Sequence, residues 1–441
     1  MNLISYILIL QLEDYQIRRF LKWVLKNPFG KALEGKKPLV WTYKAKFIAV
    51  CAGFWYLIII LGLFEVLGIF GLLFGLFLAF FPWIFVVFAL VTRRPYEAIN
   101  RKLAISKTRK IILHLKSKGL KVIGITGSYG KTTTKEFLYQ ILKDNYKVLR
   151  TPESYNTLFG IKNVIDLELD ESYDFFICEM GAYKTGEIKE LCKMAQPDYA
   201  ILTGINEQHL ERFGKIENTI KAKFELIQAV TDKTRCLLNH DCELITNSYL
   251  PYVSNSPNQL EPVFYSFEDI NITNFSLIGT ANITNAIAAA TMAKIIGLTQ
   301  TSIDKKLTEL KPFSHRLEVK ILDNGWTILD DSYNSNVDGF KLALSALKGF
   351  KGIKIIATPG IVELGSKTKE IHRELGKLCD EMCDYIILVG KNERTIALAE
   401  GITTKFKIIY MESIKLLNKT VESLNIKSPV ILIENDLTDN Y

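Results

Sequence analysis

The sequence of 441 residues has few of the features that mark a disulfide-stapled or zinc-binding protein. It contains seven cysteines, an odd number, and no two of them form a C-x-x-C pair. This excludes a zinc ribbon and a disulfide framework, and it indicates a reducing compartment. With 27 glycines, 12 prolines and 48% hydrophobic residues, the chain is neither collagen-like nor disordered. The length predicts two to four domains.

Acidic residues are scarce at the start of the chain. The first 120 residues hold 18 lysines and arginines against 5 aspartates and glutamates, whereas the remainder holds 37 against 42. A basic front followed by a mildly acidic body is not typical of a nucleic-acid-binding protein, so we expect no nucleic-acid partner. The pattern indicates a membrane-proximal segment attached to a soluble part.

Two long runs without a charged residue lie in this basic region. Residues 47–64 form the first run and residues 66–91 the second, with Glu65 between them. Eighteen helical residues reach about 27 Å, close to one hydrocarbon thickness. Positive charges flank both ends: Lys44, Lys46, Arg93 and Arg94. We therefore predict a transmembrane helical hairpin at about residues 47–91, in contact with membrane lipid. The protein is then a multi-pass protein of the inner or cytoplasmic membrane, and its catalytic domains are expected to lie in the cytoplasm. A buried pair of core helices is the alternative.

From residue 121 onward, short apolar runs alternate with helical patterns. Residues 121–126, 173–180 and 198–205 are predicted strands, and five further runs follow a turn near Pro312. Such alternation predicts parallel sheets with helices on both faces. The predicted fold class is α/β: a P-loop central domain with a mainly parallel sheet and a Rossmann-like C-terminal domain, preceded by the transmembrane hairpin. The expected domains are residues 1–120, 121–312 and 313–441.

The most informative stretch is GITGSYGKTTTKE at residues 124–136. A strand leads into a glycine-bearing loop, and Lys131 and Thr132 open a helix. Glycines let backbone N–H groups surround phosphate oxygens, and the helix N-terminus adds partial positive charge. Lys131 is expected to reach the β- and γ-phosphates, and the Thr132 hydroxyl to bind Mg²⁺. Ile125 stands where the general pattern has its first glycine, so an ordinary glycine turn is the alternative.

An ordered series of blocks resembles the Mur ligase family. After TGSYGKTTTKE come EMGAYKTGEI, INEQHLERFG, AKFE, GTANITNAIAAA, SHRLE, DDSYNSN and VELG. The resemblance covers about residues 121–441. It is nearest to the branch that adds D-alanyl-D-alanine to UDP-N-acetylmuramoyl-tripeptide.

The resemblance implies an ADP-forming, ATP-dependent ligase of peptidoglycan precursor synthesis. Such an enzyme activates a carboxylate as an acyl phosphate, which the amine of an amino acid or dipeptide then attacks. Phosphoryl transfer is mostly positioning and charge neutralisation. ATP and two Mg²⁺ sites are the implied cofactors. The acceptor is a peptidoglycan precursor, either UDP-linked or lipid-linked.

The resemblance also assigns roles to individual residues. Glu179 and Thr132 would hold one Mg²⁺, and His209 and a carbamylated Lys223 the second, with Lys221 as the competing position. The expected nucleotide-binding residues are Gly127, Ser128, Tyr129, Gly130, Lys131, Thr132, Thr133, Asn282, Asn285, Arg316 and Asp331. Lys131, His209 and Lys223 are the expected catalytic residues, and Asn156, Asn334 and Asn336 are expected to bind substrate.

Two departures from the family pattern concern the acceptor. The first 120 residues replace the domain that usually grips the UDP-sugar, and the loop TPESYNTLFG keeps only Asn156 of the usual asparagine pattern. The alternatives are a related ligase or amidotransferase acting on a lipid-linked precursor, a membrane-anchored nucleotide-binding scaffold for cell-wall enzymes, and a P-loop kinase or transport ATPase.

Overall fold

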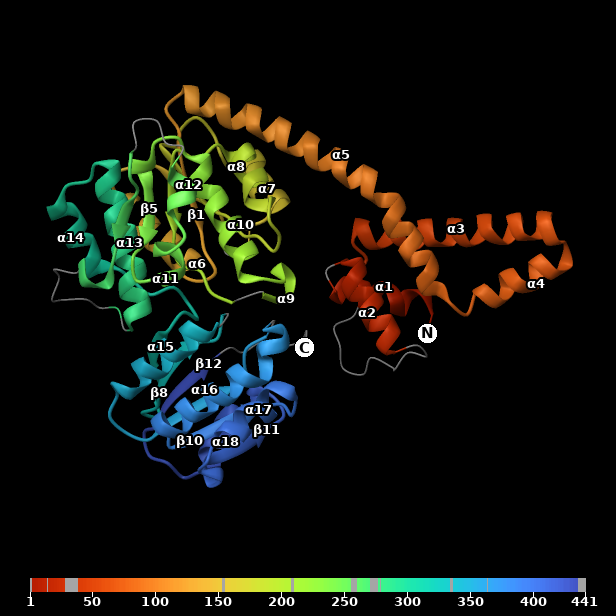
Figure 1. Ribbon diagram of the computed structural model, residues 1–441. Helices are drawn as coiled ribbons and strands as arrows, with labels where there is room; N and C mark the ends of the chain where they lie inside the picture. Colours follow the sequence, from red (N-terminus) through yellow and green to blue (C-terminus); the bar gives the residue numbers. More distant parts are fainter. Residues whose placement is uncertain are drawn as a thin grey trace. The chain divides into compact units, whose positions relative to one another are not determined.

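The computed structural model divides the chain into two compact units, Met1–Leu103 and Ala104–Leu437. The described residues are 2–13, 15–27, 39–152, 155–207, 210–254, 260–269, 277, 279–333, 336–362 and 364–434. Each unit has its own hydrophobic core, and Figure 1 shows the helices and strands of both.

The first unit is helical. It contains α1 (Leu3–Leu12), α2 (Ile17–Lys26), α3 (Tyr43–Leu67), α4 (Ile69–Leu78) and the beginning of α5 (Pro82–Ser117). Phe20, Ile48 and Val86 are fully buried where α1, α2, α3 and α5 pack together. The Glu97 carboxylate forms ion pairs with Lys44 (3.3 Å) and Arg93 (2.7 Å). The pair with Lys44 joins the start of α3 to α5.

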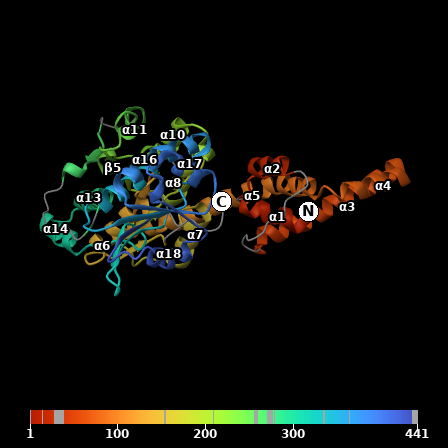
Figure 2. The same ribbon diagram turned by 90° about the horizontal axis from the view of Figure 1, so that it is seen from below.

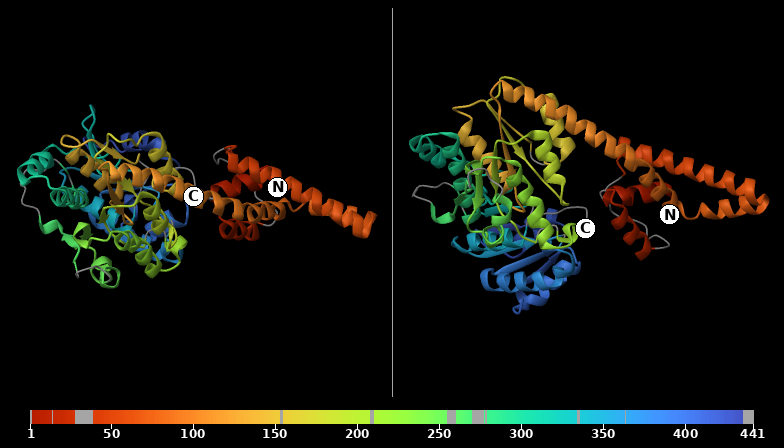
Figure 3. Two further views of the ribbon diagram at one scale, coloured as in Figure 1. Left: turned by 90° about the horizontal axis from the view of Figure 1, so that it is seen from above. Right: turned by 45° about the horizontal axis from the view of Figure 1, so that its top comes forward.

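The expected hairpin differs from the structure in its second arm. Helix α3 is long and apolar enough to cross a membrane, and it ends at Leu67, just before Gly68, whose φ of +58° suits glycine. Helix α4 then turns back along α3 (Figure 3). The second apolar run is not one straight helix, because α4 and α5 meet at an 85° bend. Pro82 explains the break, since a proline disfavours helix in the residue before it.

The second unit begins with a six-stranded parallel sheet in the order β2-β3-β1-β4-β5-β6. The strands are β1 (Lys121–Thr126), β2 (Val148–Arg150), β3 (Phe175–Glu179), β4 (Tyr199–Leu202), β5 (Cys236–Asn239) and β6 (Val263–Tyr265). The helices are α6 (Lys131–Leu142), α7 (Leu158–Leu167), α8 (Glu187–Ala195), α9 (Leu210–Phe213), α10 (Ile216–Ala229), α11 (Glu243–Thr246), α12 (Leu250–Val253), α13 (Thr280–Ile296) and α14 (Gln300–Glu309).

Helices cover both faces of this sheet, as the alternating pattern predicts. Alternate strand residues point to opposite faces, so Val122 belongs to one core and Ile123 to the other. One core includes α7, α8, α10 and the end of α5, and the other includes α6 and α13 (Figure 1). The apolar faces of these helices pack against the two faces of the sheet, and this burial stabilises the sheet.

A second six-stranded sheet has the order β11-β10-β9-β12-β8-β7, and β7 pairs antiparallel with β8. Its strands are β7 (Glu318–Ile321), β8 (Thr327–Asp331), β9 (Lys354–Thr358), β10 (Tyr385–Val389), β11 (Ile408–Met411) and β12 (Val430–Glu434). Its helices are α15 (Val337–Lys348), α16 (Thr368–Met382), α17 (Glu393–Gly401) and α18 (Leu417–Ser423). Helices α16 and α17 lie side by side (Figure 2) because Gly376 and Gly401 let their backbones approach closely. The α/β prediction is confirmed for both sheets.

Candidate active site

The loop between β1 and α6 needs its glycines. Gly130 has a φ of +77°, in the left-handed region that favours glycine. A Cβ at Gly130 would lie 2.5 Å from the Asn285 side-chain oxygen, and a Cβ at Gly127 would lie 2.1 Å from the Thr203 hydroxyl. The loop is therefore packed tightly against the loop after β4 and against α13, and its shape follows from these close approaches.

Lys131, the first residue of α6, folds back over this loop. Its amine donates to the carbonyls of Gly127 (2.9 Å) and Ser128 (3.2 Å). Burial lowers the pKa of the Lys131 amine, while the nearby Glu179 carboxylate acts in the opposite direction. The amine therefore lies beside the loop that the sequence predicts to hold phosphates.

Glu179 is the last residue of β3, and its register partner on β1 is Ile125, just before the glycine loop. Its carboxylate accepts hydrogen bonds from the Thr132 hydroxyl (3.0 Å) and from the Asn156 amide (3.4 Å). The structure thus brings together two predicted metal ligands and one predicted substrate residue. Carboxylate and hydroxyl oxygens are donors that suit Mg²⁺, so the residues present fit a magnesium ion.

One residue at this position was missed. Lys135 is completely buried, and its amine lies 3.2 Å from the same Glu179 carboxylate. It stands four residues after Lys131, on the same face of α6. That spacing was the available signal, because Thr132 of the same helix was already expected to share a magnesium ion with Glu179.

Lys223 lies on α10 and is buried, with 3% of its surface exposed. Burial, together with the charge of Lys131, lowers the pKa of its amine to about 7, although Glu187, Glu179 and Glu225 oppose the change. Because Lys131 and Glu179 both affect this pKa, the Lys223 amine lies close to the phosphate loop. His209, its expected partner, lies outside the described residues, and so does Asn334.

A small cavity of about 70 Å³ gathers most of the predicted nucleotide residues. Those that line it are Tyr129, Gly130, Thr133, Asn282, Asn285, Arg316 and Asp331, together with Asn336, which was predicted to bind substrate. An adjoining cavity of about 630 Å³ extends from Tyr129 past Cys242 and Phe267 to Lys341. Tyr129 of the phosphate loop lines both cavities. Their other walls come from the domain that contains the first sheet and from the domain that contains the second sheet.

The side chains around the small cavity are held by protein partners. The Asn285 side-chain oxygen accepts from the Thr134 hydroxyl (3.2 Å), and the Asn282 amide donates to the Arg316 carbonyl (3.4 Å). The Asp331 carboxylate accepts from the Leu317 N–H (3.0 Å), and burial raises the pKa of Asp331. The Asn282–Arg316 bond connects α13 with the start of the second sheet's domain, and the Asn285–Thr134 bond connects α13 with α6.

Asn206, in the loop after β4, joins the two domains directly. Its side-chain amide donates to the Asn336 side-chain oxygen (2.9 Å) and to the Asp338 carboxylate (2.9 Å). Its backbone N–H donates to the Ser128 hydroxyl (3.2 Å) in the phosphate loop. A second link is the ion pair between Lys367 and Glu207, at 3.4 Å. Asn206 therefore connects the phosphate loop to the start of α15.

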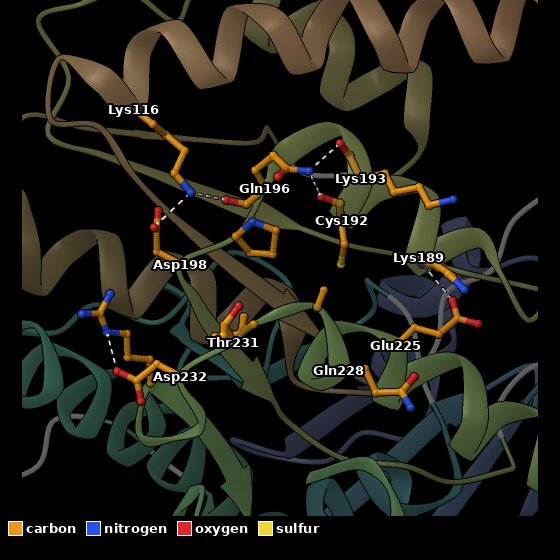
Figure 4. Close-up of a pocket in the computed structure, with 14 residues that line it drawn as sticks. Lys116, Lys189, Cys192, Lys193, Gln196, Asp198, Glu225, Gln228, Thr231 and Asp232 are labelled. Atoms are coloured by element: carbon orange, nitrogen blue, oxygen red, sulfur yellow. Dashed lines mark hydrogen bonds and ion pairs between the residues drawn. The ribbon is translucent and has the colours of Figure 1, made fainter. Parts of the chain in front are cut away.

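Another cavity, of about 560 Å³, contains none of the predicted site residues (Figure 4). Its walls come from the ends of α5, α8 and α10 and from Asp198, which precedes β4. Lys116 donates to the Gln196 carbonyl (2.7 Å) and pairs with Asp198 (3.0 Å), and Arg235 pairs with Asp232 (3.2 Å). It lies at the amino end of β4, whereas ligands of parallel sheets bind at the carboxyl ends.

Comparison with known proteins matches both domains of the second unit. The model of the Mur ligase middle domain matches residues 125–293, and that of the Mur ligase, glutamate ligase domain matches residues 315–432. A UDP-N-acetylmuramoyl-tripeptide--D-alanyl-D-alanine ligase of Bacillus subtilis is 30% identical over 311 residues, which are 67% of each chain. This chain belongs to the Mur ligase family.

Other Mur ligases agree with this assignment. The Escherichia coli relative of the same name is 28% identical over 350 residues, covering 72% of this chain and 76% of that protein. The crystal structure of MurF ligase from Thermotoga maritima in complex with ADP has a TM-score of 0.67 and 26% identity, covering 76% of this chain and 80% of that one. MurF from Acinetobacter baumannii has a TM-score of 0.65 and 25% identity, with coverage of 75% and 77%. The predictions of a Mur ligase and of its fold are confirmed.

Proposed function

We propose that this chain is an ATP-dependent, ADP-forming ligase that joins D-alanyl-D-alanine to UDP-N-acetylmuramoyl-tripeptide in peptidoglycan precursor synthesis. The relatives that carry this name support the substrate pair. The observation that carries the proposal is the meeting of Lys131, Thr132 and Glu179 at the carboxyl ends of β1 and β3. A triphosphate bound there would lie against the N-terminus of α6, whose dipole favours negative charge.

The reaction has two steps, a phosphoryl transfer and an acyl transfer. The tripeptide carboxylate attacks the γ-phosphorus of ATP and displaces ADP, and the dipeptide amine then attacks the acyl phosphate, giving the amide and inorganic phosphate. Lys131 and the α6 N-terminus neutralise the phosphate oxygens as charge shifts toward ADP. Thr132 and Glu179 would hold Mg²⁺, which supplies further charge neutralisation when it is bound. Closing the two domains would keep water from the acyl phosphate, and Asn206 would help to hold them closed.

We propose that Lys223 becomes a ligand of a second Mg²⁺ by carbamylation. A neutral lysine amine adds carbon dioxide and releases a proton, so that a carbamate with anionic oxygens replaces the amine. The pKa of about 7 supports this step, because about half of the Lys223 side chains are then neutral near pH 7. Carbamate oxygens are ligands that Mg²⁺ prefers. His209 is the proposed companion ligand.

We further propose that the first unit places this ligase at the cytoplasmic membrane. The support is the length and apolarity of α3, the exposure of its apolar residues Val50, Phe54 and Leu61, and the basic residues at the ends of the apolar runs. A membrane-bound ligase would be well placed to take a lipid-linked precursor as an alternative acceptor.

The test is phosphate release by the purified full-length chain with ATP and Mg²⁺. The ligase predicts that release needs both an acceptor and D-alanyl-D-alanine, and mass spectrometry should find the joined pentapeptide. Parallel assays with UDP-linked and lipid-linked acceptor distinguish the two precursors. Nucleotide binding without turnover on either acceptor would contradict the proposal and favour a scaffold.

A further inference from the structure

Lys135 is a charged residue beside Glu179 that takes no part in the proposed reaction. It is fully buried at the second turn of α6, and burying a charge is costly unless it is paired. Its amine lies 3.2 Å from the Glu179 carboxylate and 3.8 Å from that of Glu136. Glu136 is already paired with the guanidinium of Arg150 at 2.8 Å, so Glu179 is the main partner of Lys135.

Lys135 and Thr132 share one oxygen of Glu179. Both the Lys135 amine and the Thr132 hydroxyl reach Oε2, at 3.2 Å and 3.0 Å, while the Asn156 amide reaches Oε1 at 3.4 Å. The carboxylate is therefore charge-balanced and hydrogen-bonded by protein groups alone. A divalent ion entering here gains little from Glu179 unless another anion arrives with it.

We propose that Lys135 is a positioning residue that serves as the resident counter-ion of Glu179, so that a divalent metal enters this site only together with the nucleotide phosphates. This inference rests on the proposed metal–nucleotide site at Glu179 and adds a binding order to it. Metal and phosphate then arrive as one complex, and the site holds no metal between turnovers.

The charges near Glu179 support this order. Glu179 faces two lysines of α6, Lys131 and Lys135, so the region beside the phosphate loop carries a positive balance that repels a lone divalent cation and attracts a polyphosphate. Within the part of the chain that the structure describes, no group of three or more His, Cys, Asp or Glu residues is placed to hold a metal by itself. A bound triphosphate reverses the sign of the field and supplies further oxygen ligands.

The test measures metal binding without turnover. The full-length chain in detergent is titrated with Mn²⁺, with and without ADP, and equilibrium dialysis measures the Mn²⁺ retained with the protein, because ADP in solution also binds Mn²⁺. A carbon dioxide-depleted buffer keeps Lys223 free of carbamate. The variants are Lys135→Met, which removes the charge, and Lys135→Arg, which keeps it. The matched control is Lys233→Met, because Lys233 is also buried, at 5% exposure, and its amine donates to the Ile227 carbonyl (2.7 Å).

We expect the wild type to bind Mn²⁺ only when ADP is present. Lys135→Met should bind Mn²⁺ without ADP at least about tenfold more tightly than the wild type, because the charge that neutralises Glu179 and repels the cation is removed. Lys135→Arg and Lys233→Met should behave like the wild type.

Wild-type binding of Mn²⁺ that is equally tight with and without ADP overturns the inference, and so does a folded Lys135→Met variant with unchanged Mn²⁺ binding. The wild-type comparison can overturn the binding order even if Lys135→Met fails to fold, and Lys135→Gln, which also removes the charge, then tests the role of Lys135. Absence of Mn²⁺ binding in the presence of ADP would instead refute the proposed metal–nucleotide site itself.

Discussion

Replacing Lys223 by methionine should change how the stability of the second unit depends on pH. The amine has a pKa of about 7 in the folded chain because it is buried, and 10.5 when exposed in the unfolded chain. Between these values the unfolded state binds more protons than the folded state, so the free energy of unfolding of the wild type rises with pH through this window. Below pH 7 both states are protonated, and the full cost of burying the charge is present.

The size of the effect follows from the same two values. A fall from 10.5 to about 7 corresponds to at most about 5 kcal/mol, at about 1.4 kcal/mol per pH unit. Lys223→Met keeps the length of the side chain and removes the charge. The variant should therefore be more stable than the wild type at pH 7, by up to a few kcal/mol, and the advantage should disappear near pH 10.

The assay is thermal unfolding of the full-length chain in detergent at several pH values between 6.5 and 10. Lys221→Met is the matched control, because Lys221 is exposed on the same helix and should give no pH-dependent difference. Added bicarbonate near pH 8 should raise the melting temperature of the wild type but not that of Lys223→Met, since only the wild type forms a carbamate. An equal pH dependence in wild type and Lys223→Met would refute the reasoning, because it would mean that the buried amine keeps an ordinary pKa.

Three further predictions follow from close contacts. Lys131→Ala should lower the affinity for a fluorescent ADP analogue at least about tenfold, because a phosphate-binding charge is lost; unchanged affinity would exclude this loop as the nucleotide site. Gly376→Ala should destabilise the second sheet's domain by about 3 kcal/mol in thermal unfolding, because its Cβ would lie 2.2 Å from the Leu398 carbonyl. Gly349→Ala should cost much less, because its Cβ would lie 3.3 Å from the Ala346 carbonyl. Asn206→Ala should lower kcat more than ATP affinity, because it removes the two 2.9 Å bonds between the domains; a change in KM alone would argue against a role in closure.

The local pattern of the chain was sufficient to predict much of the fold. The run KVIGIT forms β1 as expected, and the strands that end in Glu179 and Leu202 also appear where alternation predicted them. The strand β5 was not identified, because its apolar run, Cys236 to Leu238, is only three residues long and has polar residues on both sides. The bend between α4 and α5 was not anticipated either, because hydropathy reports how apolar a run is and not whether it stays straight.

The sequence by itself determined the phosphate loop and its chemistry, because glycine conformation, a helix N-terminus and a following lysine and threonine all lie within a few residues of one another. It also determined that the first unit is apolar and basic. Only the tertiary structure decided that Lys135 neutralises Glu179, that Asn206 links the phosphate loop to α15, and that Lys223 has a lowered pKa. Those properties depend on burial and on partners far away along the chain, and such contacts exist only once the strands have been ordered into sheets.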